Sequence, residues 1–276
     1  MARLVSWLSR WPLGLLHAFG SLLGWGVFLA SGVYRRRFIQ NARQAGFRFS
    51  DVRGAVGQAG RLVAELPRLW SAQPVPIACT GIEHVKAAHA TERGLLFLTP
   101  HLGSFEVTAQ AYAARYASVG RSITVMYRPA RQAWLQAWMG GARDRPGLQA
   151  VPTTLAGIKQ MLKALKAGEA VGLLPDQVPP EGQGVWSDFF GHAAYTMTLS
   201  ARLALQTDAV VLLVWGERLP AGQGYVVHFE PFPQPQARQL EPLVNQINQA
   251  MERLVRRCPR QYLWGYARYK QPRPEA

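Results

Sequence analysis

The chain has 276 residues, 49% of them hydrophobic and 17% charged, a length and composition that allow one substantial buried core and exclude an intrinsically disordered protein. The formal net charge of +15 indicates an anionic partner, and because no zinc-finger or RNA-recognition signature accompanies it, we expect a membrane lipid or a phosphorylated substrate and no nucleic acid. The 2 cysteines, Cys79 and Cys258, have neither disulfide nor metal-site spacing, which fits a reducing cytoplasmic environment.

The first predicted element is an apolar helix. Residues 11–34 carry no formal charge at neutral pH, and about two dozen helical residues can cross about 30 Å of hydrocarbon. Arginine is more frequent after this stretch than before it, at Arg35, Arg36, Arg37, Arg43 and Arg48 against Arg3 and Arg10. Positive charge marks the cytoplasmic side of a membrane segment. We therefore interpret residues 1–34 as a membrane anchor, either a transmembrane helix or a helix lying on the membrane, that keeps residues 35–276 in the cytoplasm.

The elements that follow indicate an α/β fold. Residues 35–70 repeat apolar positions at three- and four-residue steps, which predicts one or two amphipathic helices with positive charge. Short apolar runs then predict strands at residues 77–79, 95–99, 123–127, 149–151, 171–174, 210–215 and 225–229. Among the segments between them, residues 153–166 have a Thr near the start and a Lys at the end, as a capped helix does. This alternation is typical of a mostly parallel central sheet flanked by helices.

The strongest local pattern, residues 94–116, is a buried strand followed by His101 and a helix. Polar groups at the C-terminal edge of a strand in an open α/β sheet face the ligand crevice, so His101 is a candidate general base. Glu106 follows in the first helical turn, where its carboxylate could accept a hydrogen bond from one imidazole nitrogen and leave the other free. A loop His with a solvated Glu is the alternative. Metal ligation by these two residues and Asp176 is not expected, because no second His joins them at a recognisable spacing.

Further polar residues follow two of the predicted strands. Arg128 comes directly after residues 123–127, and a guanidinium is suited to bidentate contact with phosphate. Asp176 and Gln177 come after residues 171–174, where they could hydrogen-bond sugar hydroxyls or orient Arg128. A surface arginine and a simple turn are the structural alternatives.

Several sequence segments together carry a family pattern. They are RRRFIQNARQAGF, TPHLGSFE, VMYRPAR, LLPDQ and VWSDFFGHAAYT, the last ending at Thr196. In this order they resemble the bacterial lipid A secondary acyltransferases, the lauroyl and myristoyl transferases, which belong to the lysophospholipid acyltransferase superfamily and share its HxxxxE motif. The sequence departs from that pattern at Ser104 and Phe105, where Asn and Trp are more usual, and at Tyr266 and Ala267, where His and Arg are common.

The resemblance implies a glycerolphosphate-acyltransferase-like fold, with an acyltransferase domain over residues 35–276 that faces the cytoplasm at the bacterial inner membrane. It implies an O-acyltransferase that moves a fatty acyl chain from acyl carrier protein, or from coenzyme A, to a hydroxyl of a lipid A precursor or related glycolipid, without a resident cofactor. His101 would be the general base and Glu106 its partner. The residues implied in substrate binding are Arg128, Asp176, Gln177, Phe190, Gly191 and Thr196, with Phe190 and Gly191 in a loop.

Other functions stay open at this point. The same chemistry could act on a lysophospholipid, a phosphoglycolipid or an amino-acid lipid. A basic protein that binds membranes or nucleic acid without catalysis would share the positive charge. A serine hydrolase is not expected, because no GxSxG nucleophile elbow occurs in the sequence.

Overall fold

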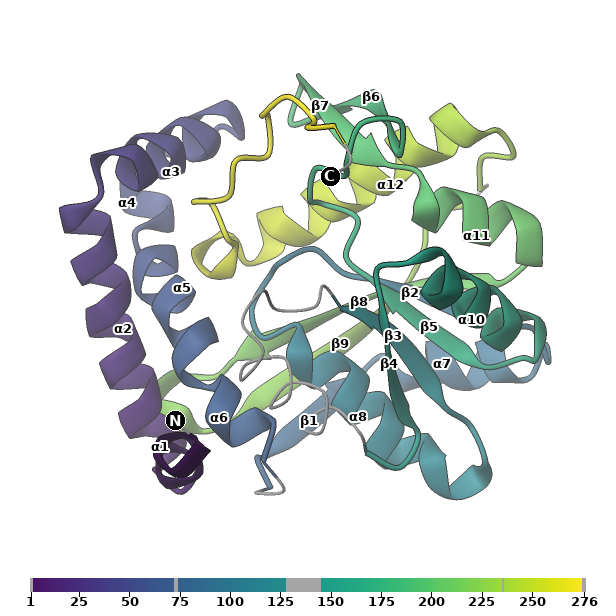
Figure 1. Ribbon diagram of the computed structural model, residues 1–276, viewed down its shortest axis with the longest axis horizontal. Coiled ribbons are helices and arrows are strands. Elements are labelled where there is room, and N and C mark those ends of the chain that lie inside the picture. The colour runs from purple at the N-terminus through teal and green to yellow at the C-terminus, as the bar shows by residue number, and fades with distance from the viewer. Residues whose placement is uncertain (1, 72–73, 128–144, 235, 275–276) are drawn as a thin grey trace.

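The computed structural model describes residues 2–71, 74–127, 145–234 and 236–274 (Figure 1). Within these residues the main sheet has the strand order β1-β9-β8-β2-β5-β3-β4. All neighbouring strands are parallel except β8 and β9, which form an antiparallel pair. The strands are β1 (Ile77–Thr80), β2 (Leu95–Leu98), β3 (Ile123–Tyr127), β4 (Leu148–Pro152), β5 (Ala170–Leu173), β8 (Val210–Arg218) and β9 (Tyr225–Pro231). The predicted α/β fold and all the predicted strands are therefore confirmed.

Helices cover both faces of the sheet, because side chains alternate along each buried strand. In β2, Leu95 and Phe97 belong to the apolar cluster that includes α7 and α8, whereas Leu96 and Leu98 belong to the cluster that includes α10, α11 and α12. These helices are α7 (Ile82–His89), α8 (Glu106–Tyr116), α10 (Leu155–Lys166), α11 (Leu199–Thr207) and α12 (Leu240–Arg257). Short 3₁₀ turns lie at η1 (Ala117–Val119), η2 (Pro220–Gly222) and η3 (Pro259–Gln261). The predicted helix at 153–166 is α10, whose N-cap is Thr154.

A second, two-stranded sheet was not predicted from the sequence. It consists of β6 (Gly184–Phe189) and β7 (His192–Met197), which pair in antiparallel register. The residues expected to form a loop, Phe190 and Gly191, are its turn, and both have positive φ, +51° and +73°. The hairpin packs against α12.

The N-terminal part is helical, as predicted, but in more pieces than expected. The helices are α1 (Ala2–Leu8), α2 (Leu13–Ala30), α3 (Gly32–Gln44), α4 (Phe49–Val52), α5 (Gly54–Ala64) and α6 (Leu66–Leu69). Helix α2 is the apolar helix, and within the described residues it is the one that is long and apolar enough to cross a membrane. It runs along one side of the molecule beside α5 (Figure 1).

Glycines allow the backbones of α2 and α5 to approach closely. A Cβ atom at Gly60 would lie 1.8 Å from the carbonyl oxygen of Gly20, and one at Gly24 would lie 2.3 Å from the carbonyl oxygen of Val56. Gly57 lies in the same contact, facing Ser21. We call Gly20, Gly24, Gly57 and Gly60 the glycine seam. Its close packing holds α2 against the body of the protein.

Substitution of Gly60 by alanine should therefore destabilise the protein. The added methyl group overlaps the backbone of α2, so we expect a loss of about 1–3 kcal/mol in the free energy of unfolding. The control is Gly26→Ala, because Gly26 is exposed on α2 and a Cβ atom there would meet no other atom within 4 Å. That change should be neutral or stabilising by up to about 1 kcal/mol. Denaturant unfolding of both variants in one detergent checks the difference, and equal stabilities would contradict the seam.

Candidate active site

Two neighbouring parallel strands bring the central residues of the site together. His101 follows β2 and Asp176 follows β5, and the last residues of these strands, Leu98 and Leu173, are register partners. The backbone N–H of Thr99 continues the pairing by donating to the carbonyl of Leu173 at 3.1 Å. Because parallel strands end at the same edge, the side chains that follow them meet there.

Asp176 and Gln177 hold the imidazole of His101 from both sides. The Nδ1 atom of His101 lies 2.7 Å from Oδ1 of Asp176, and its backbone N–H donates to Oδ2 at 2.9 Å. The amide nitrogen of Gln177 lies 2.9 Å from Nε2 of His101. A carboxylate only accepts and an amide nitrogen only donates, so this arrangement requires the proton on Nδ1 and a lone pair on Nε2. That tautomer can act as a base through Nε2.

The carboxylate beside His101 is buried and charged. Burial alone would raise the pKa of Asp176. The positive charge of the protonated form of His101, the hydrogen bonds from His101 and the charge of Arg268 lower that pKa below its ordinary value. The hydroxyl of Tyr262 also donates to Oδ2 of Asp176 at 3.3 Å. Burial, followed by the nearby Asp176 charge, raises the pKa of Tyr262 well above its ordinary value, so Tyr262 stays a neutral donor. The site therefore contains a fixed negative charge that can stabilise a protonated imidazole.

The loop that follows His101 fits only a glycine at position 103. Gly103 has φ +59°, and a Cβ atom there would lie 1.9 Å from the carbonyl oxygen of Gly216. The C-terminal segment fixes the same loop, because Gly103 N–H donates to Gln261 and Leu263 N–H donates to His101, at 3.0 and 3.1 Å. The position of His101 is thus set by β8 and by a segment more than 150 residues away in sequence.

A buried ion pair between Arg218 and Glu65 holds this loop through the carbonyl of Gly103. Arg218 donates to both carboxylate oxygens of Glu65, at 2.7 and 2.8 Å, and to the carbonyl of Gly103 at 2.8 Å. Nε2 of His17 in α2 and the hydroxyl of Tyr225 each lie 3.0 Å from Oε2 of Glu65. Burial would raise the pKa of Glu65, but the charge and hydrogen bonds of Arg218, together with the hydrogen bond from His17, lower it to about 2. The pair connects α2, the end of β8 and the His101 loop.

The structure differs from the expected partnership of His101 and Glu106. Among the described residues, the carboxylate that contacts the imidazole is Asp176, and Glu106 accepts a hydrogen bond from Nε1 of Trp70 at 3.0 Å. The reason is geometric, since Glu106 begins α8 whereas Asp176 follows the strand next to β2. Asp176 and Gln177 were expected to bind substrate, but in the structure both side chains contact the imidazole of His101. Arg128 lies outside the described residues.

The other residues expected to bind substrate lie in the β6–β7 hairpin and do not contact His101. Phe190 is buried, and its backbone N–H donates to Glu252. The hydroxyl of Thr196 is fully buried and donates to a backbone carbonyl while it accepts from Asn248 and Arg268, at 3.1 and 2.6 Å. Its hydrogen-bonding capacity is used within the fold.

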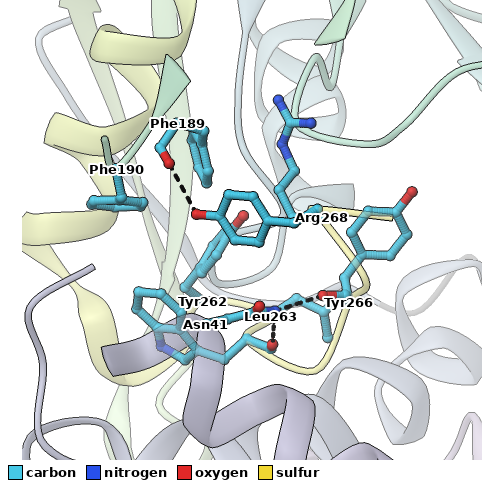
Figure 2. Close-up of a pocket in the computed structure, with 9 residues that line it drawn as sticks. Asn41, Phe189, Phe190, Tyr262, Leu263, Tyr266 and Arg268 are labelled. Atoms are coloured by element: carbon cyan, nitrogen blue, oxygen red, sulfur yellow. Dashed lines mark hydrogen bonds between the residues drawn. The ribbon is translucent and has the colours of Figure 1, made fainter. Parts of the chain in front are cut away.

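A small aromatic pocket includes Tyr262, the hydrogen-bond donor to Asp176, in its lining. It is lined by Asn41, Phe189, Phe190, Tyr262, Leu263, Trp264, Tyr266, Arg268 and Tyr269. Figure 2 shows Phe189, Phe190 and Tyr262 around it, with Asn41 holding the C-terminal segment through the carbonyls of Trp264 and Tyr266. Through Tyr262 the pocket reaches Asp176 and hence His101. No group of three His, Cys, Asp or Glu side chains suited to a metal ion occurs in the part of the chain that the structure describes.

Sequence reasoning missed three residues that shape the site. Tyr262 lies in the C-terminal segment YLWGYARYK, close to Tyr266 and Ala267, where the sequence departs from the family pattern, and no sequence signal marked Tyr262 itself. Glu65 and Arg218 are 153 positions apart, and no spacing rule connects them. Glu65 is the one acidic residue among the arginines of residues 53–70, which is a weak hint.

Similar proteins are found for most of the chain. Residues 52–271 match the family described as bacterial lipid A biosynthesis acyltransferase. The chain is 29% identical over 200 residues to the lipid A biosynthesis lauroyltransferase of Escherichia coli K12, covering 71% of this chain and 62% of that protein. Over 191 residues it is 25% identical to the palmitoleoyltransferase of the same organism, covering 69% and 60%. Over 190 residues it is 25% identical to the lipid A biosynthesis acyltransferase of Haemophilus influenzae, covering 67% and 56%. The chain thus spans about three-fifths of the length of the curated relatives it matches.

The buried ion pair predicts how stability depends on pH. A carboxyl whose pKa is lowered in the folded protein stabilises it above the ordinary pKa, here 4.5, and this stability is lost as the pH falls toward about 2. Glu65→Gln leaves Arg218 buried without its counterion, so at pH 7 we expect a loss of about 3–5 kcal/mol. The free energies of unfolding of wild type and variant, measured with denaturant, should converge as the pH falls from 4.5 to 2. The control is Glu241→Gln, because Glu241 is exposed. Its free energy of unfolding should stay within about 0.5 kcal/mol of wild type over the whole pH range.

Proposed function

The chain belongs to the bacterial lipid A biosynthesis acyltransferase family, and we propose on this basis that it transfers a fatty acyl chain from a thioester to a hydroxyl of a lipid A precursor or related glycolipid. The observation that carries the proposal is the state of His101. Its Nδ1 proton is directed at the buried carboxylate of Asp176, and its Nε2 lone pair faces the amide nitrogen of Gln177. This is the arrangement that a general base for a hydroxyl group needs.

In the proposed reaction the acceptor hydroxyl takes the place of the Gln177 amide at Nε2 of His101. The imidazole removes the hydroxyl proton while the oxygen attacks the thioester carbonyl carbon. The tetrahedral intermediate then collapses, the carbon–sulfur bond breaks, and the thiol leaves with the proton held by the imidazole. No protein nucleophile is required. Asp176 stabilises the imidazolium, since it carries a negative charge that has no access to water.

The role of Glu106 is proposed from the resemblance and not from contact with His101. The motif pattern makes Glu106 the partner of His101, whereas the hydrogen bonds support Asp176 as the carboxylate that orients the ring. We propose that Asp176 fixes the tautomer and that Glu106 acts on the same histidine when substrate is bound. Catalytic hydrogen bonds often tighten only in the substrate complex. Arg128, which directly follows β3 in the sequence, is proposed to hold a phosphate of the acceptor.

The donor and the location are also proposals. Acyl carrier protein is the proposed donor, with acyl-coenzyme A as the alternative, and the proposed location is the cytoplasmic face of the bacterial inner membrane. The net charge of +15 supports this, because carrier protein, coenzyme A, anionic lipid and lipid A precursor are all negatively charged. The apolar helix α2 supports attachment to a membrane.

The proposal is tested by radiolabelled acyl transfer. Wild-type protein with labelled acyl carrier protein and a tetra-acylated lipid A precursor should give a product with one more acyl chain, separated by thin-layer chromatography. His101→Ala should lower the rate roughly 10²- to 10⁴-fold while keeping the melting temperature. The control His84→Ala changes a partly exposed histidine on α7 and should keep full activity. Absence of product with every lipid acceptor and both thioester donors would leave a basic membrane-binding protein instead.

Whether Asp176 and Glu106 both act through His101 can be tested in His101→Ala protein, which lacks the general base. Asp176→Asn should reverse the donor and acceptor roles at Nδ1 and lower kcat about 10²- to 10⁴-fold. If Asp176 and Glu106 both act through His101, Asp176→Asn and Glu106→Gln should have no further effect in His101→Ala protein. A further loss caused by Glu106→Gln in that background would show that Glu106 acts independently of the histidine.

A further inference from the structure

The exposed side of α2 carries only apolar residues. They are Leu15, Ala18, Phe19, Leu22, Leu23, Gly26, Val27, Leu29 and Ala30. The exposed fractions of Leu22 and Leu29 are 73% and 67%. A helix that meets water is usually polar on its outer face, and a continuous apolar surface indicates contact with lipid or with another protein. We call this set the apolar face of α2.

The opposite side of α2 is attached to the body from one end to the other. Near its N-terminus the backbone lies against η2, where a Cβ atom at Gly222 would be 2.2 Å from the nitrogen of Gly14. The middle is held by the glycine seam. Near the C-terminus the ring of Phe28 lies 5.5 Å from the rings of both Phe38 and Phe49. Helix α2 is therefore packed against the rest of the folded protein along its length and is not an independent helix.

This attachment is incompatible with α2 crossing the bilayer alone. Its 18 residues give a length of about 27 Å, slightly less than the roughly 30 Å of hydrocarbon. A crossing α2 would carry α5 and the following turn into the hydrocarbon, together with the amide of Gln58 and the ionisable groups of Arg61 and Glu65. Polar and ionisable groups are costly there. Separation of α2 from α5 would instead expose His17 and break its contact with Glu65.

Arginines lie at both ends of the apolar face. Arg10 precedes α2 and is exposed, and Arg36 lies in the first turns of α3. Arg35 donates to the carbonyls of Phe28 and Leu29, at 3.3 and 2.8 Å, which holds its guanidinium at the C-terminal end of the face. An apolar strip bounded by guanidinium groups matches the layering of an anionic bilayer, in which acyl chains lie beneath phosphates. Another protein would match the apolar strip but would not explain the flanking charges.

We infer that α2 lies flat in the cytoplasmic leaflet of an anionic phospholipid bilayer, with its apolar face among the acyl chains and the flanking arginines among the phosphates. The chain is then attached to one leaflet and does not span the membrane. The inference rests on the membrane location within the proposed function and is independent of the acyl-transfer chemistry.

The topology is tested with a single cysteine. Ser6→Cys is placed at an exposed position of α1 in a Cys79→Ser, Cys258→Ser background and treated with a membrane-impermeant maleimide. We expect labelling in inverted inner-membrane vesicles and none in intact spheroplasts, because both ends of a flat helix stay on the cytoplasmic side. The control is Lys159→Cys at an exposed position of α10, which should label from the same side. Labelling of Ser6→Cys from the outside would show that α2 spans the membrane and overturn the inference.

The lipid contact is tested by flotation with vesicles of phosphatidylethanolamine and phosphatidylglycerol. Leu22→Glu combined with Leu29→Glu should lower the partition coefficient about 100-fold or more and leave the unfolding midpoint unchanged, since both leucines are exposed. The matched control Leu155→Glu, at a leucine 79% exposed on α10, should bind as wild type. His101→Ala should also bind as wild type, so failure of acyl transfer and failure of membrane docking are distinguished. Unchanged binding of the double variant, or equal loss in the control, would overturn the inference.

Discussion

The buried ion pair of Glu65 and Arg218 is the interaction on which the arrangement of the molecule depends. Arg218 ends β8, and its guanidinium binds the carboxylate of Glu65 and the carbonyl of Gly103 together. His17 of α2 and Tyr225 of β9 also donate to Glu65. Charged groups that are buried away from water are tolerated only when each has a partner. Moving any of these elements would therefore leave a polar or charged group unpaired in the core, which is destabilising. The pair therefore fixes how the N-terminal helices, the sheet and the loop after β2 lie relative to one another.

The chemistry of the site depends on a second constraint, the adjacency of β2 and β5. Each strand ends in a short segment that carries polar residues, and the parallel register brings His101 and Asp176 within 2.7 Å. Burial of Asp176 and its three donors keep the charge in place, so the histidine is oriented before any substrate arrives. The site is thus preorganised by backbone pairing and not by the local sequence around His101.

This difference explains what could be predicted from the sequence and what could not. The strands of the main sheet and α10 were predicted because apolar runs and capping residues are local signals. His101, Asp176 and Gln177 were recognised as residues at strand ends, but the order of strands decides which ends are neighbours, and that order is set by long-range packing. Glu106 was favoured as the partner of His101 because the HxxxxE pattern of the family pairs these two positions. The β6–β7 hairpin was missed because its turn, Phe190 and Gly191, lacks the usual Asn-Gly or Asp-Gly pair.

The contact between Gln177 and Nε2 of His101 has a consequence for unproductive turnover. In the proposed reaction, a water molecule that reached this nitrogen could be activated like an alcohol and would hydrolyse the thioester. The amide nitrogen at 2.9 Å already occupies the lone pair, so water must compete with a donor that is tethered to the chain and needs no recruitment from solution. A bound lipid alcohol, held by many other contacts, can displace the amide where a single water cannot. Gln177 would then limit hydrolysis of the acyl thioester by water.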